Sequence, residues 1–201
     1  MTSTVENKKI HPHKFAMWLA IASIVMMFAG LTSAYVVKQS GGMWRSYQLP
    51  QIFWVSTVVI ITSSVTLALG ISAFKKKETA KLKQWMLLTL VLGIVFVVLQ
   101  YFGFQQLYNQ PQQVILSGEQ QNLSLPVQVN GNPSESFLFV IAGLHLLHII
   151  GGIIALGIVY MKATWKKMTP PTLVAWEVIG TYWHFVDLLW IYLFIFFIAN
   201  Q

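Results

Sequence analysis

The chain contains no cysteine and few charged side chains. Its 201 residues include no cysteine, and 9% of them are charged. The lack of cysteine excludes disulfides, thiolate metal ligands and thiol chemistry. A soluble domain carries about a quarter charged residues, whereas here 56% of the residues are hydrophobic. The composition therefore predicts an integral membrane protein.

Five long apolar segments lie at about 15–37, 52–74, 84–108, 136–161 and 173–199. At 1.5 Å per residue each can cross about 30 Å of hydrocarbon, and none resembles the short alternating strands of a barrel. The first segment exceeds the 7–15 apolar residues typical of a signal peptide, so we expect it to be retained. We predict an all-α integral membrane fold, a five-helix transmembrane bundle that forms a single membrane domain over residues 1–201.

The positive charge is unevenly divided between the two sides of this bundle. Eleven of the thirteen basic residues fall on the side of the N-terminus, and two fall on the other. The eleven are Lys8, Lys9, Lys14, Lys75, Lys76, Lys77, Lys81, Lys83, Lys162, Lys166 and Lys167, and the two are Lys38 and Arg45. Because basic residues accumulate in cytoplasmic loops, we predict a cytoplasmic N-terminus and a C-terminus outside.

The segment 109–134 differs in character from the apolar stretches. It is rich in Gln and Asn and contains three prolines and the pair Asn130-Gly131. This composition predicts an external loop, either with a short β-hairpin that turns at Asn130-Gly131 or as a solvated loop that lies on a neighbouring subunit.

The last apolar segment carries a stripe of ionisable residues. At about 100° per residue, Glu177, His184 and Asp187 fall near one face of a helix. A carboxylate facing lipid would cost about 2.5–3.5 kcal/mol even on lenient scales. The stripe must therefore face protein, and His145 and His148 on the preceding segment are the best candidate partners.

These five polar residues are compatible with four kinds of site. Imidazole and carboxylate side chains suit a metal ion, although the Glu-x-x-His spacing of carboxylate-bridged di-metal helices is missing. Facing histidines could ligate haem, with Gly151 and Gly152 leaving space for it. Intramembrane acids and histidines also form proton relays. The fourth interpretation is a hydrogen-bond network that fixes two helices in register. The residues alone leave all four open.

Small residues recur at near-helical spacing on several segments, which predicts close helix packing in lipid. They are Ala16, Ala20, Ser23 and Gly30 on the first segment, Gly143, Gly151, Gly152 and Ala155 on the fourth, and Ser63, Ser64 and Thr66 on the second.

The stretch 182–190 carries a histidine-containing motif formed by Tyr182, Trp183, His184, Phe185, Val186, Asp187 and Trp190. This motif resembles the signature of the last helix in a known family, subunit III of haem–copper terminal oxidases. Glu177, seven residues before His184, matches a family glutamate. The stretch from His145 through His148 to Gly151 resembles the paired-histidine motif of the preceding helix. The segment 17–31 and Gln100 are similar to further family positions.

This resemblance implies an accessory, non-catalytic and non-redox subunit of a proton-pumping cytochrome c oxidase in the bacterial inner membrane. It implies that haem and copper are held by subunit I, that copper is held by subunit II, and that this chain binds no metal. It also implies packing on subunit I and other oxidase subunits, bound phospholipid, and support of proton uptake and of stability during turnover. His145, His148, Glu177, His184 and Asp187 then form a structural network. Nucleic acid is not an expected partner, and a contact with another respiratory complex stays open.

Three other functions compete with this one. The equivalent subunit of a quinol oxidase would share the same motifs. A free-standing membrane haem or metal protein would use His145, His148 and His184. A small proton-coupled transporter is disfavoured because the chain shows no inverted repeat and no paired, broken apolar segments.

The chain departs from the family at two positions where a membrane glutamate is common. Ile24 follows Ser23 on the first segment, and Gly103 lies three residues after Gln100. A carboxylate role in proton handling therefore does not transfer to either position.

Overall fold

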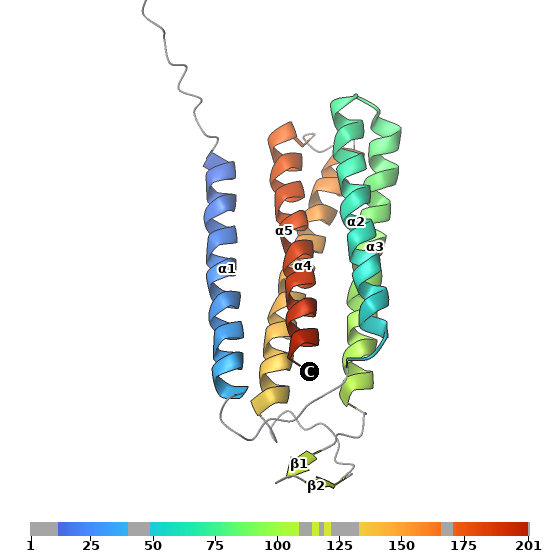
Figure 1. Ribbon diagram of the computed structural model, residues 1–201. Helices are drawn as coiled ribbons and strands as arrows, with labels where there is room; N and C mark the ends of the chain where they lie inside the picture. The colour runs from blue at the N-terminus through green and yellow to red at the C-terminus, as the bar shows by residue number, and fades with distance from the viewer. Residues whose placement is uncertain are drawn as a thin grey trace, which may run out of the picture.

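Five long helices run side by side as a bundle in the part of the chain that the structure describes (Figure 1). They are α1 (Pro12–Gln39), α2 (Ile52–Lys75), α3 (Thr79–Tyr108), α4 (Pro133–Thr164) and α5 (Leu173–Ala199). The computed structural model describes residues 12–39, 49–108, 114–116, 119–121, 133–165 and 171–200. Each helix is long and apolar enough to cross a membrane, which confirms the predicted transmembrane bundle.

The helix ends lie close to the predicted ones. The largest difference is at the start of α3, which begins at Thr79 rather than near residue 84. The first residues of α3 include Lys81 and Lys83, whose long side chains favour a helix although they interrupt the apolar pattern. The apolar pattern marks the part of the helix in the hydrocarbon core of the membrane, whereas the helix itself continues into the headgroup region.

The turn between α2 and α3 is closed by backbone hydrogen bonds. Lys77 N–H donates to the Phe74 carbonyl and Glu78 N–H donates to the Ala73 carbonyl, at 3.0 Å each. This pair of bonds is the Schellman motif that ends many helices. Its left-handed position, usually a glycine, is held by Lys77 with φ of 61°.

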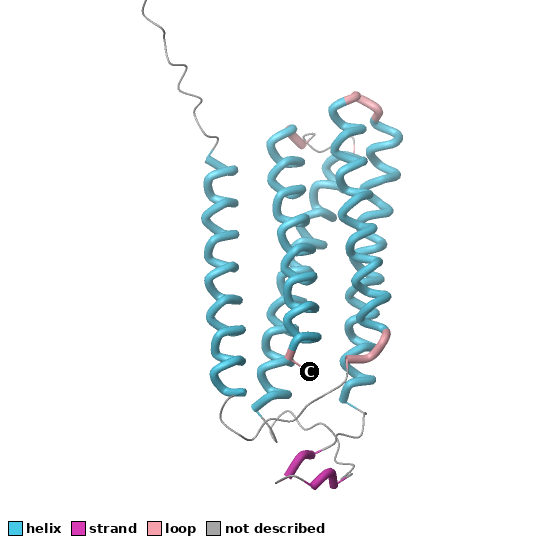
Figure 2. The backbone as a smooth tube through the Cα atoms, viewed as in Figure 1, coloured by secondary structure: helices cyan, strands magenta, loops and turns pink. Residues whose placement is uncertain are grey.

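The segment between α3 and α4 contains two short antiparallel strands, β1 (Val114–Leu116) and β2 (Glu119–Gln121). Val114 pairs with Gln121, and Leu116 pairs with Glu119. These strands lie at the end of the bundle where the chain ends (Figure 2). The hairpin expected at Asn130-Gly131 lies outside the described residues.

At the opposite end of the bundle lie the start of α1, the α2–α3 turn and the start of α5 (Figure 1). We call this the lysine-rich end, because Lys14, Lys75, Lys77, Lys81 and Lys83 belong to it. Basic side chains that are separated in the sequence therefore lie on one side of the bundle.

α5 is the central helix of the packing. Three clusters of buried apolar side chains fill the bundle, and α5 contributes to each of them. Leu193 belongs to the first cluster, Trp183 to the second and Trp190 to the third. Trp183, Val186 and Trp190 of the recognisable motif are therefore core residues.

α1 is the least buried helix of the bundle. Phe28 and Tyr35, in its second half, belong to the first cluster and anchor α1 on α4 and α5. Its first half presents Phe15, Trp18 and Leu19, each more than 60% exposed. Such an apolar surface is suited to lipid or to another membrane subunit.

Candidate functional site

Trp183 lies where four helices meet. Its indole Nε1–H donates to the Ser63 hydroxyl of α2 at 3.1 Å, and both side chains are buried. A Cβ on Gly93 of α3 would lie 2.8 Å from the indole ring, and a Cβ on Gly152 of α4 would lie 3.3 Å from it. Two glycines therefore make room for a large ring that is held on its polar side by a hydroxyl.

Trp190, seven residues further along α5, repeats this arrangement. Its Nε1–H donates to the Thr57 hydroxyl of α2 at 3.0 Å. The indole stacks on the His145 ring with a centroid distance of 5.3 Å and an interplanar angle of 28°. Phe96 of α3 meets the same indole edge-on at 5.4 Å.

The Thr57 and Ser63 hydroxyls of α2 each donate one hydrogen bond and accept another. Thr57 donates to the Phe53 carbonyl at 2.7 Å while it accepts from Trp190. Ser63 donates to the Ile60 carbonyl at 2.8 Å while it accepts from Trp183. Such fully satisfied buried groups stabilise a helix contact, because none of them is left desolvated without a partner.

His184 also pairs with α2. Its Nδ1 and the Ser64 hydroxyl share a hydrogen bond of 2.5 Å. Asp187 is buried, with 3% of its surface exposed, and its carboxyl lies beside the same Ser64 hydroxyl without hydrogen-bond geometry. His184 and Asp187 of the α5 stripe thus face protein as predicted, but their neighbour is α2.

The α4 histidines do not meet the α5 carboxylates. His148 bonds through Nδ1 to the Leu144 carbonyl of its own helix at 2.7 Å. The buried His145 ring makes no hydrogen bond within the part of the chain that the structure describes and is instead surrounded by aromatic rings. The polar link from α4 to α5 is Tyr182, whose hydroxyl donates to the His148 carbonyl at 3.0 Å.

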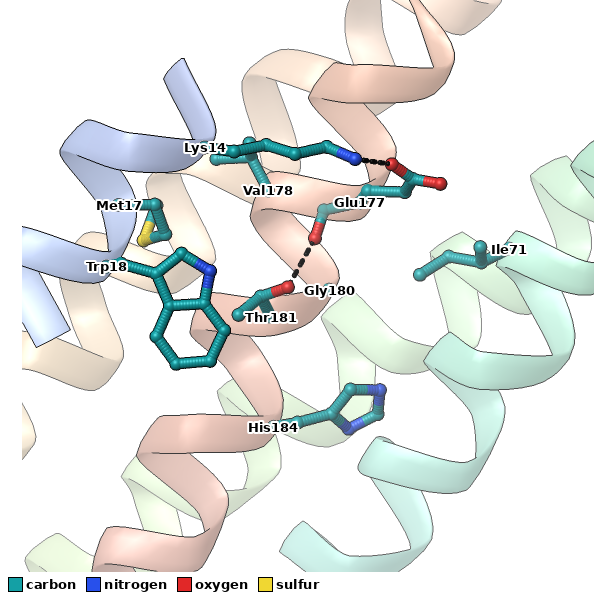
Figure 3. Close-up of a pocket in the computed structure, with 9 residues that line it drawn as sticks. All are labelled: Lys14, Met17, Trp18, Ile71, Glu177, Val178, Gly180, Thr181 and His184. Atoms are coloured by element: carbon teal, nitrogen blue, oxygen red, sulfur yellow. Dashed lines mark hydrogen bonds and ion pairs between the residues drawn. The ribbon is translucent and has the colours of Figure 1, made fainter. Parts of the chain in front are cut away.

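Glu177 lies nearer the lysine-rich end and pairs with α1. Its Oε2 is 2.6 Å from Lys14 Nζ, with the two side chains 31% and 43% exposed. Figure 3 shows this ion pair across the space between α1 and α5, with His184 deeper in the same pocket. Glu177 is therefore separated from the buried members of the expected network.

Two cavities lie between the first half of α1 and α5. One, of about 410 Å³, is lined by Trp18, Glu177 and His184 among others. The second, of about 520 Å³, is lined by Ala16, Ala20 and Val159 among others. Because both cavities are also lined by Met17 and Val178, we treat them together and call them the α1 wedge.

The glycines of the predicted packing stripes differ in role. Gly152 packs against Tyr182 and Trp183. Gly30, Gly143 and Gly151 have open space where a Cβ would lie. The glycine that packs against the α5 motif is therefore Gly152, and not Gly151, the one taken as the motif glycine from the sequence.

The departure at Gly103 has a packing explanation. A Cβ there would lie 2.9 Å from Ile52 and 3.0 Å from Phe53. Gln100, one turn earlier, reaches α2 through a hydrogen bond from Nε2 to the Ser56 hydroxyl at 3.0 Å. Helix α3 thus approaches α2 too closely at Gly103 for a glutamate side chain.

Sequence reasoning missed the role of the α2 hydroxyls as partners of α5. The sequence pattern predicts only a packing role for Ser63 and Ser64 and indicates no role for Thr57. Thr57 and Ser63, the partners of Trp190 and Trp183, are six residues apart on α2, and the two tryptophans are seven residues apart on α5. Both spacings are close to two helical turns, which is the signal that could have paired the two helices.

The described residues contain no group of three His, Asp or Glu side chains placed to hold one metal ion. Within the same part of the chain, the motif side chains bond to neighbouring helices and do not converge on one cavity. This arrangement defines an α-helical membrane protein whose polar motif residues connect helices.

Comparison with known proteins identifies the family. The family model for cytochrome c oxidase subunit III matches residues 120–199. A probable cytochrome c oxidase subunit 3 of Mycobacterium leprae is 32% identical over 185 residues, which cover 88% of this chain and 81% of the relative. The cytochrome c oxidase subunit 3 of Corynebacterium diphtheriae is 29% identical, with 97% of each chain covered. A probable quinol oxidase subunit 3 of Staphylococcus haemolyticus is 27% identical, with 96% and 92% covered.

The chain belongs to the cytochrome c oxidase subunit III family. As a subunit III it is part of a multi-subunit oxidase complex. Its five apolar helices and its bacterial relatives make it a multi-pass protein of the bacterial inner membrane. The predicted family and location are confirmed.

Proposed function

We propose that this chain is an accessory, non-redox subunit that packs on subunit I of a proton-pumping oxidase. The proposal places haem and copper in subunit I, places further copper in subunit II, and assigns no catalytic residue to this chain. The proposal rests on the hydrogen bonds that the motif side chains make inside the bundle. Trp183, Trp190 and His184 are engaged with hydroxyls of α2 inside the bundle.

We propose the outward face of α4 as the contact with subunit I. Leu147, Ile150 and Ile154 on this face are 65%, 42% and 57% exposed. Gly143 and Gly151 lie on the same face with open space above them. Small residues on an apolar face let a second helix approach closely in lipid, which supports this assignment.

A leucine at Gly151 tests this face, with a leucine at Gly30 on α1 as the control. Both positions have open space around them in the chain, so neither substitution disturbs the bundle itself. We expect Gly151→Leu to reduce recovery of the subunit with the oxidase, and Gly30→Leu to leave it unchanged. The reverse result would assign the contact to α1.

We further propose that phospholipid acyl chains occupy the α1 wedge. The wedge is lined largely by apolar side chains, and its two cavities hold about 410 and 520 Å³. The Lys14–Glu177 pair at the wedge can interact with a polar headgroup. Lipid in this position would support α1, which is anchored mainly through its second half.

The proposed orientation puts the lysine-rich end in the cytoplasm. Basic residues accumulate on that side of bacterial membrane proteins. In this orientation Glu177 and the α2–α3 turn lie on the side from which an oxidase takes up protons. This placement supports a role in proton uptake and in stability during turnover.

We propose cytochrome c as the electron donor of the complex. Two relatives named as subunits of cytochrome c oxidases are 32% and 29% identical to this chain. The relative named as a quinol oxidase subunit is 27% identical. The alternative, a quinol oxidase, would use the same subunit architecture with a different donor site elsewhere in the complex.

Affinity purification of the tagged chain in mild detergent tests the proposal. We expect a haem- and copper-containing partner to copurify and the chain itself to be colourless once separated. Oxidation of reduced cytochrome c, compared with quinol, by the purified complex identifies the donor. A chain that purifies alone and carries haem would contradict the proposal.

A further inference from the structure

A cavity at the lysine-rich end is separate from the α1 wedge. It lies between the α2–α3 turn and the region where α4 ends and α5 begins, and its volume is about 500 Å³. It shares no lining residue with either cavity of the wedge. We call it the turn cavity.

The turn cavity combines an apolar floor with a basic rim. Phe74, Leu82 and Trp176 contribute the floor, and the Phe74 and Trp176 rings lie 5.9 Å apart. Lys75, Lys77 and Lys83 also line it, and no acidic residue is among the described lining residues. Such a site suits a molecule with an apolar body and an anionic head.

The lysines of the rim are not neutralised within the described part of the chain. Lys81, on the same turn of α3 as Lys83, forms an ion pair with Glu78 at 2.9 Å and does not line the cavity. Lys77 and Lys83 form no ion pair with any described residue, and Lys75 is within electrostatic range of Glu177. The rim therefore presents unpaired positive charge.

Two helix starts and one indole reinforce the basic rim. Thr79 and Leu173, the first residues of α3 and α5, both line the cavity, and the Thr79 N–H already donates to the Lys77 carbonyl at 3.2 Å. The N-terminal ends of helices carry partial positive charge. The indole Nε1–H of the buried Trp176 has no hydrogen-bond partner among the described residues.

The backbone at Lys77 supports a role for its charge. Lys77 has a φ of 61°, in the left-handed region that favours glycine. A glycine would fit the Schellman motif of this turn better than a lysine does. The presence of a lysine at this position is explained if its ammonium group binds an anion at the rim.

We infer that the turn cavity binds an anionic phospholipid. One acyl chain lies along Phe74, Leu82 and Trp176, and the phosphate lies between Lys77, Lys83 and the two helix starts. The cavity lies at the ends of membrane-spanning helices, where lipid headgroups are found. The net positive rim favours an anionic over a zwitterionic headgroup. This inference does not depend on the proposed contact with subunit I.

The test uses the intact oxidase complex, stripped of lipid by detergent and titrated with phosphatidylglycerol or phosphatidylcholine. Native mass spectrometry counts the lipids bound to each complex. The test variant is Lys77→Gly/Lys83→Gln, in which the glycine suits the backbone of the turn. The matched control is Lys81→Gln, which removes a nearby lysine that is already paired and lies outside the cavity.

At limiting lipid, we expect the wild-type complex and the Lys81→Gln control each to bind one phosphatidylglycerol molecule more per complex than the double variant. Removal of two lysines near a headgroup should weaken this site by about 30-fold. Phosphatidylcholine should not fill the site. Subunit stoichiometry of the purified complexes verifies that the variants assemble, and Lys77→Gly alone keeps the test informative if the double variant does not.

Three results would overturn the inference. They are equal phosphatidylglycerol binding by the wild type and by Lys77→Gly, equal filling of the site by both lipids, and displacement of the lipid by millimolar inorganic phosphate. The last result would mean that the rim binds a free phosphate and not a lipid. None of the three results would change the proposed function of the subunit.

Discussion

Gly93 of α3 and Trp183 of α5 are in contact so close that a single methyl group would not fit between them. A Cβ on Gly93 would lie 2.8 Å from the indole Cη2 atom. The opposite edge of the same indole lies near Gly152 of α4, and its N–H is bound to Ser63 of α2. One side chain of the family motif thus fixes the mutual distances of four helices.

Gly93→Ala should destabilise the subunit because the added methyl group must displace the Trp183 ring. Overpacking of a well-packed core typically costs about 1–3 kcal/mol. The measurement is the thermal or denaturant-induced loss of the subunit from the purified oxidase. Gly30→Ala is the matched control, because its Cβ would meet open space within the chain and Gly30 lies outside the proposed contact with subunit I. Equal stability of the two variants would contradict the packing role of Gly93.

Trp190→Phe should remove one interhelical hydrogen bond and leave most of the packing. Thr57 keeps its own bond to the Phe53 carbonyl, so no hydroxyl is left wholly unsatisfied. We expect a loss of about 0.5–1.5 kcal/mol from the hydrogen bond, plus the effect of the smaller ring. A double-mutant cycle with Thr57→Val isolates the bond. A coupling energy of zero would show that the contact does not stabilise the α2–α5 pair.

His184→Ala should weaken the subunit or its docking without abolishing electron transfer. The change leaves the Ser64 hydroxyl without its partner on α5, at a cost of about 1–3 kcal/mol. Ser64→Ala should have a similar effect, and the two changes together should be less than additive. The measurements are subunit retention and oxygen consumption by the same preparation. Loss of all oxygen reduction in an intact complex would assign His184 a direct role in the chemistry.

Asp187→Ala should likewise impair folding or docking while oxygen reduction persists. Asp187 is buried beside Ser64 in the interior of the bundle, so its removal leaves a polar-lined gap. Asp187→Asn is the conservative control, since it keeps the shape of the side chain but cannot ionise. If Asp187→Asn abolished proton pumping in a fully assembled complex, the carboxyl would have a role beyond structure.

Disruption of the Lys14–Glu177 pair should loosen the first half of α1 and leave the rest of the bundle intact. Because the pair is substantially exposed, its contribution to total stability is small. We expect faster hydrogen exchange at the start of α1 in Glu177→Gln, and recovery in the charge-swapped variant Lys14→Glu/Glu177→Lys. Unchanged exchange in Glu177→Gln would show that apolar contacts alone hold α1.

The sequence predicted the five helices well because apolar length is a local property. It also predicted that Asp187 would face protein, because the cost of facing lipid does not depend on which helix is the neighbour. The prediction that α4 supplies the partner of His184 was wrong, because His184 bonds to Ser64 of α2. That prediction depended on sequence adjacency, whereas α5 is central and contacts α1, α2 and α4.

The detailed contacts were beyond sequence reasoning for a physical reason. Serine and threonine in an apolar helix commonly bond to their own backbone, as Thr62 does with the Val58 carbonyl. Nothing local distinguishes Thr62 from Thr57, which also accepts from a tryptophan of α5. Likewise Gly151 and Gly152 are neighbours in the sequence, and only the helix rotation decides which one packs against Trp183.

The most direct test of the accessory role is to purify the oxidase with and without this chain and to measure haem and copper per subunit I, together with the time course of oxygen consumption. We predict equal haem and copper contents and equal initial rates, with a faster loss of activity during turnover when the chain is missing. Loss of a haem or copper equivalent, or an initial rate near zero in the complex that lacks this chain, would contradict the account.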